Sequence, residues 1–335
     1  MQGGRYGLGQ RARAVFLVAV ISACGDDAPP SDAGGSSTGS TGAPDSTGSS
    51  MPAGTTAGPA STGGSGETSA SSVDSSDEDS SSGGGPISPG CGNASATTGE
   101  SVRQVEIQGV MRSFIVDAPA VIDSEQPLAL AFVFHGNGGS GQGIQGMGLQ
   151  LVPGAQEQAV FVFPDGLPFK GFGVGWNGSC DQYDMELVDT MIAMMSAEYC
   201  IDPSRIFAAG FSWGGDFCQS LACCRGDVVR AIAPASGPEL YPSIYPEACP
   251  DTERPAFRMT YADNDAYSPE MFAAILEWQR TEHGCAAETA PVEPAPCVAY
   301  QGCDEPVIAC EYPGLGHAWP SDWATETWAF FSQLD

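Results

Sequence analysis

The stretch GFSWG, from Gly210 to Gly214, places one serine between two glycines. It follows the apolar run IFAA and precedes a segment whose apolar residues have helical spacing. A serine on a tight turn between a strand and a helix presents its hydroxyl above the sheet, and side-chain bulk at either glycine would collide with neighbouring backbone. We therefore predict that Ser212 is a nucleophile rather than an ordinary loop serine.

A serine hydroxyl needs a base to take its proton, and the chain has three histidines, His135, His283 and His317. His317 follows the last predicted strand and is the expected base, because the chain order for this kind of turn is serine, acid, histidine. His283 ends a polar helix and is expected to be exposed. The acid that orients the base should follow the strand predicted near 256–261. Asp263 and Asp265 both occur there, and spacing does not choose between them.

A glycine-rich loop follows an early apolar run. The loop HGNGG, from His135 to Gly139, comes directly after the strand predicted over 128–134. Such a loop turns backbone N–H groups toward an oxygen that gains negative charge during acyl transfer. We expect the N–H groups of Asn137 and Trp213 to form this oxyanion hole. A phosphate-binding loop is the alternative, but the G-x-x-x-x-G-K-[ST] pattern is missing.

These candidates must be positioned by the elements around them. Two β-rich runs, 102–107 and 111–116, are joined at a Gln-Gly pair and predict an opening hairpin. Continuous apolar runs such as 128–134 suit strands that are buried on both faces of a parallel sheet. Segments of helical spacing, such as 184–200, alternate with these runs. The alternation predicts an α/β fold, with a mostly parallel central sheet covered by helices on both faces.

Composition predicts a single folded domain over residues 91–335. Residues 24–90 consist almost entirely of small, polar and acidic residues with proline, so we expect a disordered tether. Ahead of it, three arginines and a short apolar run predict an export signal, because the run is too short to span a bilayer. The residues ISAC resemble a bacterial lipobox, which implies a signal peptide over 1–23 and a membrane anchor only through lipid on Cys24. A plain secretory signal is the alternative.

The net charge of the chain limits the kinds of partner that it can bind. Its 41 acidic and 12 basic side chains give a formal net charge of −29. Binding to a phosphate backbone depends on Lys and Arg, so we expect no nucleic-acid partner. Repulsion also disfavours polyanionic substrates.

Eleven cysteines follow Cys24. In an exported protein this density predicts disulfides. An odd number leaves at least one thiol free or paired between molecules. Zinc binding is the rival interpretation, but no paired C-x-x-C with a nearby histidine supports it. We expect no metal and no cofactor.

Several stretches together resemble secreted α/β-hydrolases of the polyhydroxybutyrate depolymerase and feruloyl esterase type, which include carbohydrate esterases. The matching pieces span nearly all of 100–335 and are GVMRSFIVDAP, FVFHGNGG, VFVFPDG, GWNGSC, CIDPSRIFAAGFSWGG, AIAPASG, HGC at Cys285 and GLGHAWP. The resemblance implies an α/β-hydrolase fold stapled by disulfides. It also implies a serine esterase, with Ser212 as nucleophile and His317 as base.

The same resemblance bears on the acid and on two cysteines. Aligning YADNDAYSP with the family's HGxxDxxVP puts the triad acid at Asp265, with Tyr261 and Ala262 in place of His-Gly. It also implies a disulfide between Cys285 and Cys303.

The expected substrate is an ester, either a feruloyl or acetyl ester linked to plant polysaccharide or a short polyhydroxyalkanoate, cleaved outside the cytoplasm through an acyl-enzyme. His135, Trp176 and Trp319 are predicted to contact it. Phe169, Phe172 and Trp213 are expected to complete an aromatic cleft with the two other tryptophans. Two alternatives remain, namely a non-catalytic surface lipoprotein that binds glycans and a serine peptidase on the same fold.

Overall fold

A computed structural model of the protein describes residues 88–239, 249–250 and 253–334. The predicted signal peptide over 1–23, the lipid site at Cys24 and nearly all of the predicted tether lie outside these residues. Within the described part of the chain, no helix is both long enough and apolar enough to cross a bilayer.

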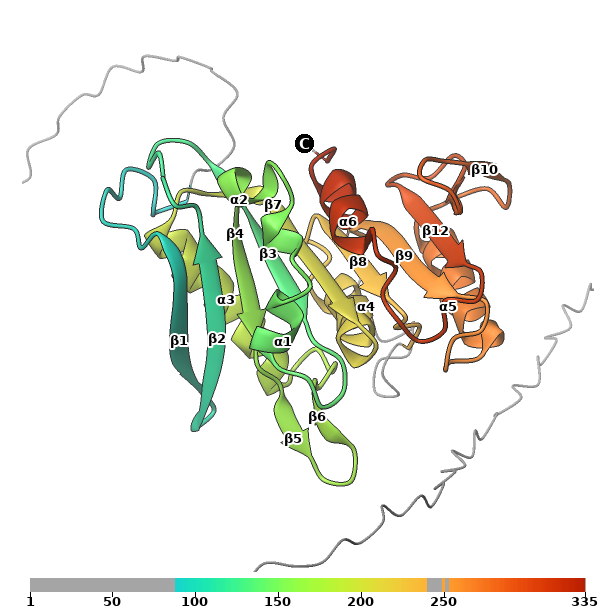
Figure 1. The fold of residues 1–335 in the computed structure, drawn as a ribbon, viewed down its shortest axis with the longest axis horizontal. Helices are drawn as coiled ribbons and strands as arrows, with labels where there is room; N and C mark the ends of the chain where they lie inside the picture. Colours follow the sequence, from blue (N-terminus) through green and yellow to red (C-terminus); the bar gives the residue numbers. More distant parts are fainter. Residues whose placement is uncertain (1–87, 240–248, 251–252, 335) are drawn as a thin grey trace, which may run out of the picture. The chain divides into compact units, whose positions relative to one another are not determined.

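A mixed ten-stranded sheet lies at the centre of the described domain (Figure 1). Its strands are β1 (Gly99–Ile107), β2 (Val110–Ala118), β3 (Leu128–Phe134), β4 (Ala159–Pro164), β7 (Ile201–Phe211), β8 (Ala231–Ala235), β9 (Ala256–Ala262), β10 (Thr289–Pro291), β11 (Cys297–Tyr300) and β12 (Val307–Tyr312). Their order across the sheet is β1-β2-β4-β3-β7-β8-β9-β12-β11-β10. The stretch from β4 to β12 is parallel, and the strands at both edges are antiparallel. The predicted opening hairpin and mostly parallel sheet are confirmed.

Helices cover both faces of this sheet, as predicted. They are α1 (Gly141–Gln145), the 3-10 turn η1 (Leu149–Leu151), α2 (Ala155–Gln158), α3 (Tyr183–Glu198), α4 (Trp213–Cys224), α5 (Pro269–Glu282) and α6 (Trp323–Phe331). Figure 1 shows α1, α2 and α6 in front of the sheet, with α3, α4 and α5 behind it. Alternate residues of β3 enter separate cores: Leu130, Phe132 and Phe134 pack with α3 to α5, while Val133 and the intervening alanines pack with α1, α2 and α6. Burial on both sides explains the continuous apolar runs.

Two hairpins go beyond the predicted elements. The Gly- and aromatic-rich stretch after β4 forms a separate two-stranded sheet, β5 (Leu167–Phe169) and β6 (Gly173–Gly175), which projects from the body of the domain (Figure 1). The short strands β10 and β11 extend the far edge of the main sheet. Strands of three or four residues carry too little periodicity to be read from sequence.

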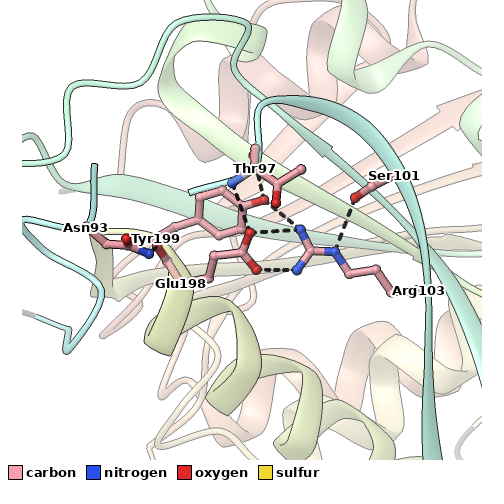
Figure 2. A network of polar contacts seen from close by, with 6 residues as sticks. All are labelled: Asn93, Thr97, Ser101, Arg103, Glu198 and Tyr199. Atoms are coloured by element: carbon pink, nitrogen blue, oxygen red, sulfur yellow. Dashed lines mark hydrogen bonds and ion pairs between the residues drawn. The ribbon is translucent and has the colours of Figure 1, made fainter. Parts of the chain in front are cut away.

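The chain enters the domain through a polar cluster on the end of α3, called here the N-terminal latch and formed by Asn93, Thr97, Arg103, Glu198 and Tyr199 (Figure 2). Arg103 pairs with Glu198 and also donates to the Tyr199 hydroxyl at 2.9 Å. That hydroxyl donates to the Thr97 carbonyl at 2.8 Å, and Asn93 donates to the Glu198 carbonyl at 2.9 Å. Burial raises the pKa of Glu198, but the hydrogen bonds from Arg103 and Thr97 outweigh it and lower that pKa to about 2.

Disulfides join distant parts of the domain. The five pairs are Cys91–Cys200, Cys180–Cys224, Cys223–Cys249, Cys285–Cys303 and Cys297–Cys310. Cys218 on α4 is a free thiol and is buried. The pairing of Cys285 with Cys303 and the presence of an unpaired thiol are therefore confirmed.

Candidate active site

Three predicted site residues follow the carboxyl ends of three parallel strands. Ser212 comes directly after β7, Asp265 after β9 and His317 after β12. Since parallel strands end at the same edge of a sheet, these loops converge, and this edge is where open α/β sheets carry their ligand sites.

Ser212 occupies a strained turn. Its φ of 52° and ψ of −123° lie outside the regions that non-glycine residues usually adopt. A Cβ at Gly210 would come within 2.3 Å of the Gly214 carbonyl oxygen, and one at Gly214 within 2.1 Å of the Phe134 carbonyl oxygen. Both positions therefore exclude any side chain, as the sequence predicts.

The imidazole of His317 lies between the serine and the acid. Its Nε2 is 2.9 Å from Oγ of Ser212, and its Nδ1 is 2.8 Å from Oδ1 of Asp265. The His317 side chain is 29% exposed, whereas that of Asp265 is fully buried. With a proton on Nδ1, the imidazole presents a lone pair to the serine hydroxyl on the solvent-accessible side.

Asp265 is held by residues that the sequence did not single out. Ser236, which follows β8, donates from its hydroxyl to Oδ2 of Asp265 at 2.6 Å. The Tyr267 N–H donates to Oδ1 at 3.1 Å. Asp263, the other candidate acid, instead accepts from the Gly314 N–H at 2.7 Å and so braces the loop that carries the histidine. No sequence pattern marks Ser236 or Tyr267.

The glycine loop after β3 lies against Ser212. A Cβ at Gly136 would be 3.2 Å from Cβ of Ser212, and Gly138 donates to the Val174 carbonyl of β6 at 2.8 Å. Trp213 follows Ser212 and is the first residue of α4, so its N–H lies at the positive end of the helix dipole. The loop and the start of α4 thus flank Ser212 as an oxyanion hole requires.

Comparisons with known proteins agree with this geometry. The chain is 34% identical over 159 residues to a probable feruloyl esterase C of Aspergillus niger, a match that covers 46% of this chain and 54% of that protein. It is 28% identical over 237 residues to feruloyl esterase D of Neurospora crassa, covering 65% and 77% respectively. With the first of these the match spans only about half the length of the relative. No protein-family model matches the chain.

Among solved structures, an acetyl xylan esterase from Aspergillus awamori superposes with a TM-score of 0.57 at 16% identity, covering 69% of this chain and all but 1% of that one. At this identity the likeness concerns the fold alone. The chain has an α/β-hydrolase fold, and its sequence resembles feruloyl esterases. The predicted fold and resemblance are confirmed.

Two of the residues predicted to contact substrate are almost entirely buried, although His135 still lines a cavity that opens on Ser212. Trp176 is fully buried in the core and donates from its indole to the His135 carbonyl at 2.8 Å. His135 is 2% exposed; its Nε2 accepts from the Gly166 N–H at 2.9 Å, and its Nδ1 lies 2.7 Å from the Gly136 carbonyl. Burial lowers the pKa of His135, in keeping with a neutral ring that bonds only to backbone. Both side chains support the glycine loop from beneath.

Of the other two predicted positions, Trp319 agrees with the structure and His283 does not. Trp319 is half-buried and stacks on Phe211, whose ring also lies 4.8 Å from that of His317, so it stands at the site as expected. His283 was expected to be exposed, and this was wrong: it is 1% exposed, with its ring nitrogens 2.7 and 3.0 Å from the carbonyls of Gln279 and Pro255. A polar helix end is buried here because the following chain folds back over it.

Two cavities open on Ser212 in place of one aromatic cleft. The first, the His317 pocket, measures about 500 Å³ and is lined by His317, Trp319 and the loop after β3. The second, the Tyr267 pocket, measures about 580 Å³; its walls are Asn137, Phe169, Phe172, Asn177, Ser179, Ser212, Trp213, Asp216, Glu239 and Tyr267. Asn137 and Ser212 line both cavities.

The Tyr267 pocket contains a buried acid. Asp216, in the first turn of α4, is 2% exposed and accepts from the Glu239 N–H at 2.8 Å. The Tyr267 hydroxyl lies 3.1 Å from its other oxygen. Burial raises the pKa of Asp216, of Glu239 and of Tyr267.

The described residues include one group of side chains with metal-like spacing, Cys180, Cys223 and Cys224. All three sulfurs are committed to disulfides and offer no thiolate.

Proposed function

We propose that the chain is a serine carboxylic-ester hydrolase that works through an acyl-enzyme. The observation that carries this proposal is the hydrogen-bonded line from Ser212 through His317 to Asp265, at 2.9 and 2.8 Å. A glycan-binding protein that only kept the fold would have no need of a strained serine aligned with a base.

The reaction follows from these positions. His317 takes the proton from Ser212 as Oγ attacks the ester carbonyl, and Asp265 stabilises the imidazolium that forms. The N–H groups of Asn137 and Trp213 donate to the oxyanion. His317 then gives its proton to the departing alcohol, which leaves the acyl group on Ser212. A water molecule repeats the sequence, with His317 as base, and releases the acid.

The proposed substrates are feruloyl or acetyl esters linked to plant polysaccharide. The names of the relatives, feruloyl esterase C and D and acetyl xylan esterase, support this class. Short polyhydroxyalkanoate esters remain a prediction from the earlier resemblance. Five disulfides support an exported location, because such bonds persist in oxidising compartments. Whether lipid on Cys24 anchors the protein remains a prediction that concerns residues outside the described part of the chain.

The direct test is Ser212→Ala. Initial rates on methyl ferulate, acetylated xylan and the matching amides should show ester cleavage by the wild type that falls at least about 10³-fold in the variant. Circular dichroism on both proteins checks that the fold is kept. Ester cleavage by Ser212→Ala at near wild-type rates would exclude the mechanism, and faster cleavage of the amides would favour a peptidase.

A further inference from the structure

A third cavity, which does not open on Ser212, lies between α5 and the strands β9, β11 and β12. It measures about 320 Å³, and we call it the α5 groove; its walls include Tyr261, Ala273, Glu277, Tyr300 and Glu311. Ala273 contributes only a methyl group from the helix, which leaves this space open. The volume is at the lower end of the range for sites that hold small organic ligands.

Three polar side chains of the groove come from the same face of the main sheet. Glu311 of β12 pairs in register with Tyr261 of β9. Both are on the side that α5 covers, since Ala309, two residues before Glu311, packs in the core shared with α3 to α5. Tyr300 of β11 packs against the same core. Among the described residues, none hydrogen-bonds to the two tyrosine hydroxyls or to the Glu311 carboxylate, so all three groups can bond to a ligand.

These groups define the chemistry of that ligand. A tyrosine hydroxyl donates and accepts, and a carboxylate only accepts. Burial raises the pKa of Tyr261 to about 12, so its hydroxyl keeps the proton that it donates. An apolar ligand would leave the groups without partners. An anion would be repelled by Glu311, because the neighbouring Arg280 is already paired with Glu277. A neutral ligand with several hydroxyls, such as a sugar, satisfies every group.

A row of aromatic rings connects the α5 groove to the catalytic edge of the sheet. The Tyr261 ring stacks on Phe272 at 4.5 Å, Phe272 lies 6.3 Å from Tyr267, and Tyr267 lies 5.7 Å from His317. The groove is therefore three ring contacts from the base. A polymer whose ester bond lies at Ser212 is long enough to extend to it, whereas a small ester is not.

We propose that the α5 groove binds a neutral sugar residue of the polysaccharide that carries the ester. The identity of the polymer rests on the proposed function. Glu311 accepts hydrogen bonds from the sugar hydroxyls, and the hydroxyls of Tyr261 and Tyr300 donate to sugar oxygens. The groove thus holds the polymer at a point outside the two cavities that open on Ser212. Polysaccharides rich in carboxylate groups are excluded.

The test is an NMR titration of the 15N-labelled full-length protein with two probes. One is xylohexaose, a neutral oligosaccharide, and the other is an oligogalacturonate of the same length, which is anionic. Neither probe carries an ester, so the measurement does not depend on catalysis. Xylohexaose should shift the amide signals of the groove, those of Ala273 and Glu311 among them, and the oligogalacturonate should bind there at least several-fold more weakly.

Substitutions in the groove then measure each contact. Glu311→Ala should raise the Kd for xylohexaose about 10-fold or more, as expected for hydrogen bonds to a charged group. Tyr261→Phe and Tyr300→Phe keep the ring and remove only the hydroxyl, so each should raise Kd several-fold. Glu288→Ala, which changes an exposed acid outside the groove, is the matched control and should leave Kd unchanged.

Three results would overturn the inference. They are the absence of shifts at the groove amides with xylohexaose, a wild-type Kd in Glu311→Ala, and binding of the oligogalacturonate as tight as that of xylohexaose. None of them bears on ester cleavage, so the proposed function would stand in each case. Failure of the proposed function would show instead as ester cleavage by Ser212→Ala.

Discussion

Ser236 adopts an unfavourable backbone conformation beside Asp265, the proposed acid. Its φ is 48°, a value uncommon for a residue with a side chain, and it is 1% exposed. The conformation places its hydroxyl 2.6 Å from Oδ2 of Asp265 while its N–H donates to the Thr260 carbonyl. Strain of this kind is often kept where it orients a functional group. We interpret Ser236 as a positioning residue for Asp265.

Replacing Ser236 separates the hydrogen bond from the strain. Ser236→Ala removes the bond and keeps the strained Cβ, whereas Ser236→Gly removes both. If the bond to Asp265 matters, both variants should lose roughly 10-fold in kcat with little change in KM, and their pH–rate profiles should shift together. A glycine variant with wild-type kcat and an unshifted profile would show that Ser236 serves only the backbone.

A residue could be predicted from the sequence where a catalytic motif fixes its position. It could not be predicted where tertiary packing alone decides its position. The G-x-S-x-G turn and the late histidine have few alternatives, so Ser212 and His317 followed from the sequence. Asp263 and Asp265 are alike in type and spacing, so only the family resemblance pointed to Asp265, and His317 Nδ1 lies 2.8 Å from that residue. Trp176 was predicted to contact substrate but lies in the core. An aromatic residue near a site can face either the core or the cleft, and the sequence does not show which.

At the scale of elements, the segment between β4 and α3 braces the glycine loop. Val174 accepts from Gly138, Gly166 donates to His135, and the Trp176 indole donates to the His135 carbonyl. The disulfide Cys180–Cys224 fastens this segment to the end of α4, the helix that begins just after Ser212. The hairpin was not predicted, because its three-residue strands are set by these tertiary contacts rather than by a hydrophobic pattern. The long elements of the sheet carry that pattern and were predicted.

The N-terminal latch gives an element-scale prediction on pH (Figure 2). The pKa of Glu198 is about 2 in the folded chain, below its ordinary value of 4.5, so the folded state binds fewer protons there than the unfolded state. Its contribution is complete above about pH 4.5 and is lost as the pH falls toward about 2. Glu198→Gln should therefore lower the free energy of unfolding at pH 7, by up to about 1 kcal/mol for this partly exposed pair, and the difference should vanish near pH 2.

Urea unfolding across this pH range measures the effect, with Glu157→Gln, an exposed glutamate of α2, as the matched control. A stability difference between wild type and Glu198→Gln that stays constant from pH 7 to pH 2 would show that the carboxylate charge contributes nothing.

At the scale of the whole molecule, the disulfides close loops of very different length. Cys91–Cys200 joins residues 109 apart in sequence, whereas Cys297–Cys310 joins residues 13 apart. The long link holds the entry of the chain to the start of β7, and the short one joins the paired strands β11 and β12. In the chain-entropy model, a bond that closes a longer loop restricts the unfolded chain more.

Double alanine variants of these two pairs test that account. Loss of Cys91–Cys200 should lower the free energy of unfolding by about 4 to 5 kcal/mol, and loss of Cys297–Cys310 by about 3 kcal/mol. Urea unfolding in oxidising buffer gives both values. The reverse order would mean that native contacts around the short bond, rather than loop length, dominate.

The proposed catalysis depends on activation of Ser212 by the neighbouring His317. Treating the folded protein with a fluorophosphonate and then measuring intact and peptide masses tests this most directly, since only an activated serine reacts. We predict one adduct per chain, on Ser212, in the wild type, and no detectable adduct in His317→Ala under the same conditions. An unlabelled wild type, or labelling of Ser212 that is unchanged in His317→Ala, would contradict the proposed mechanism.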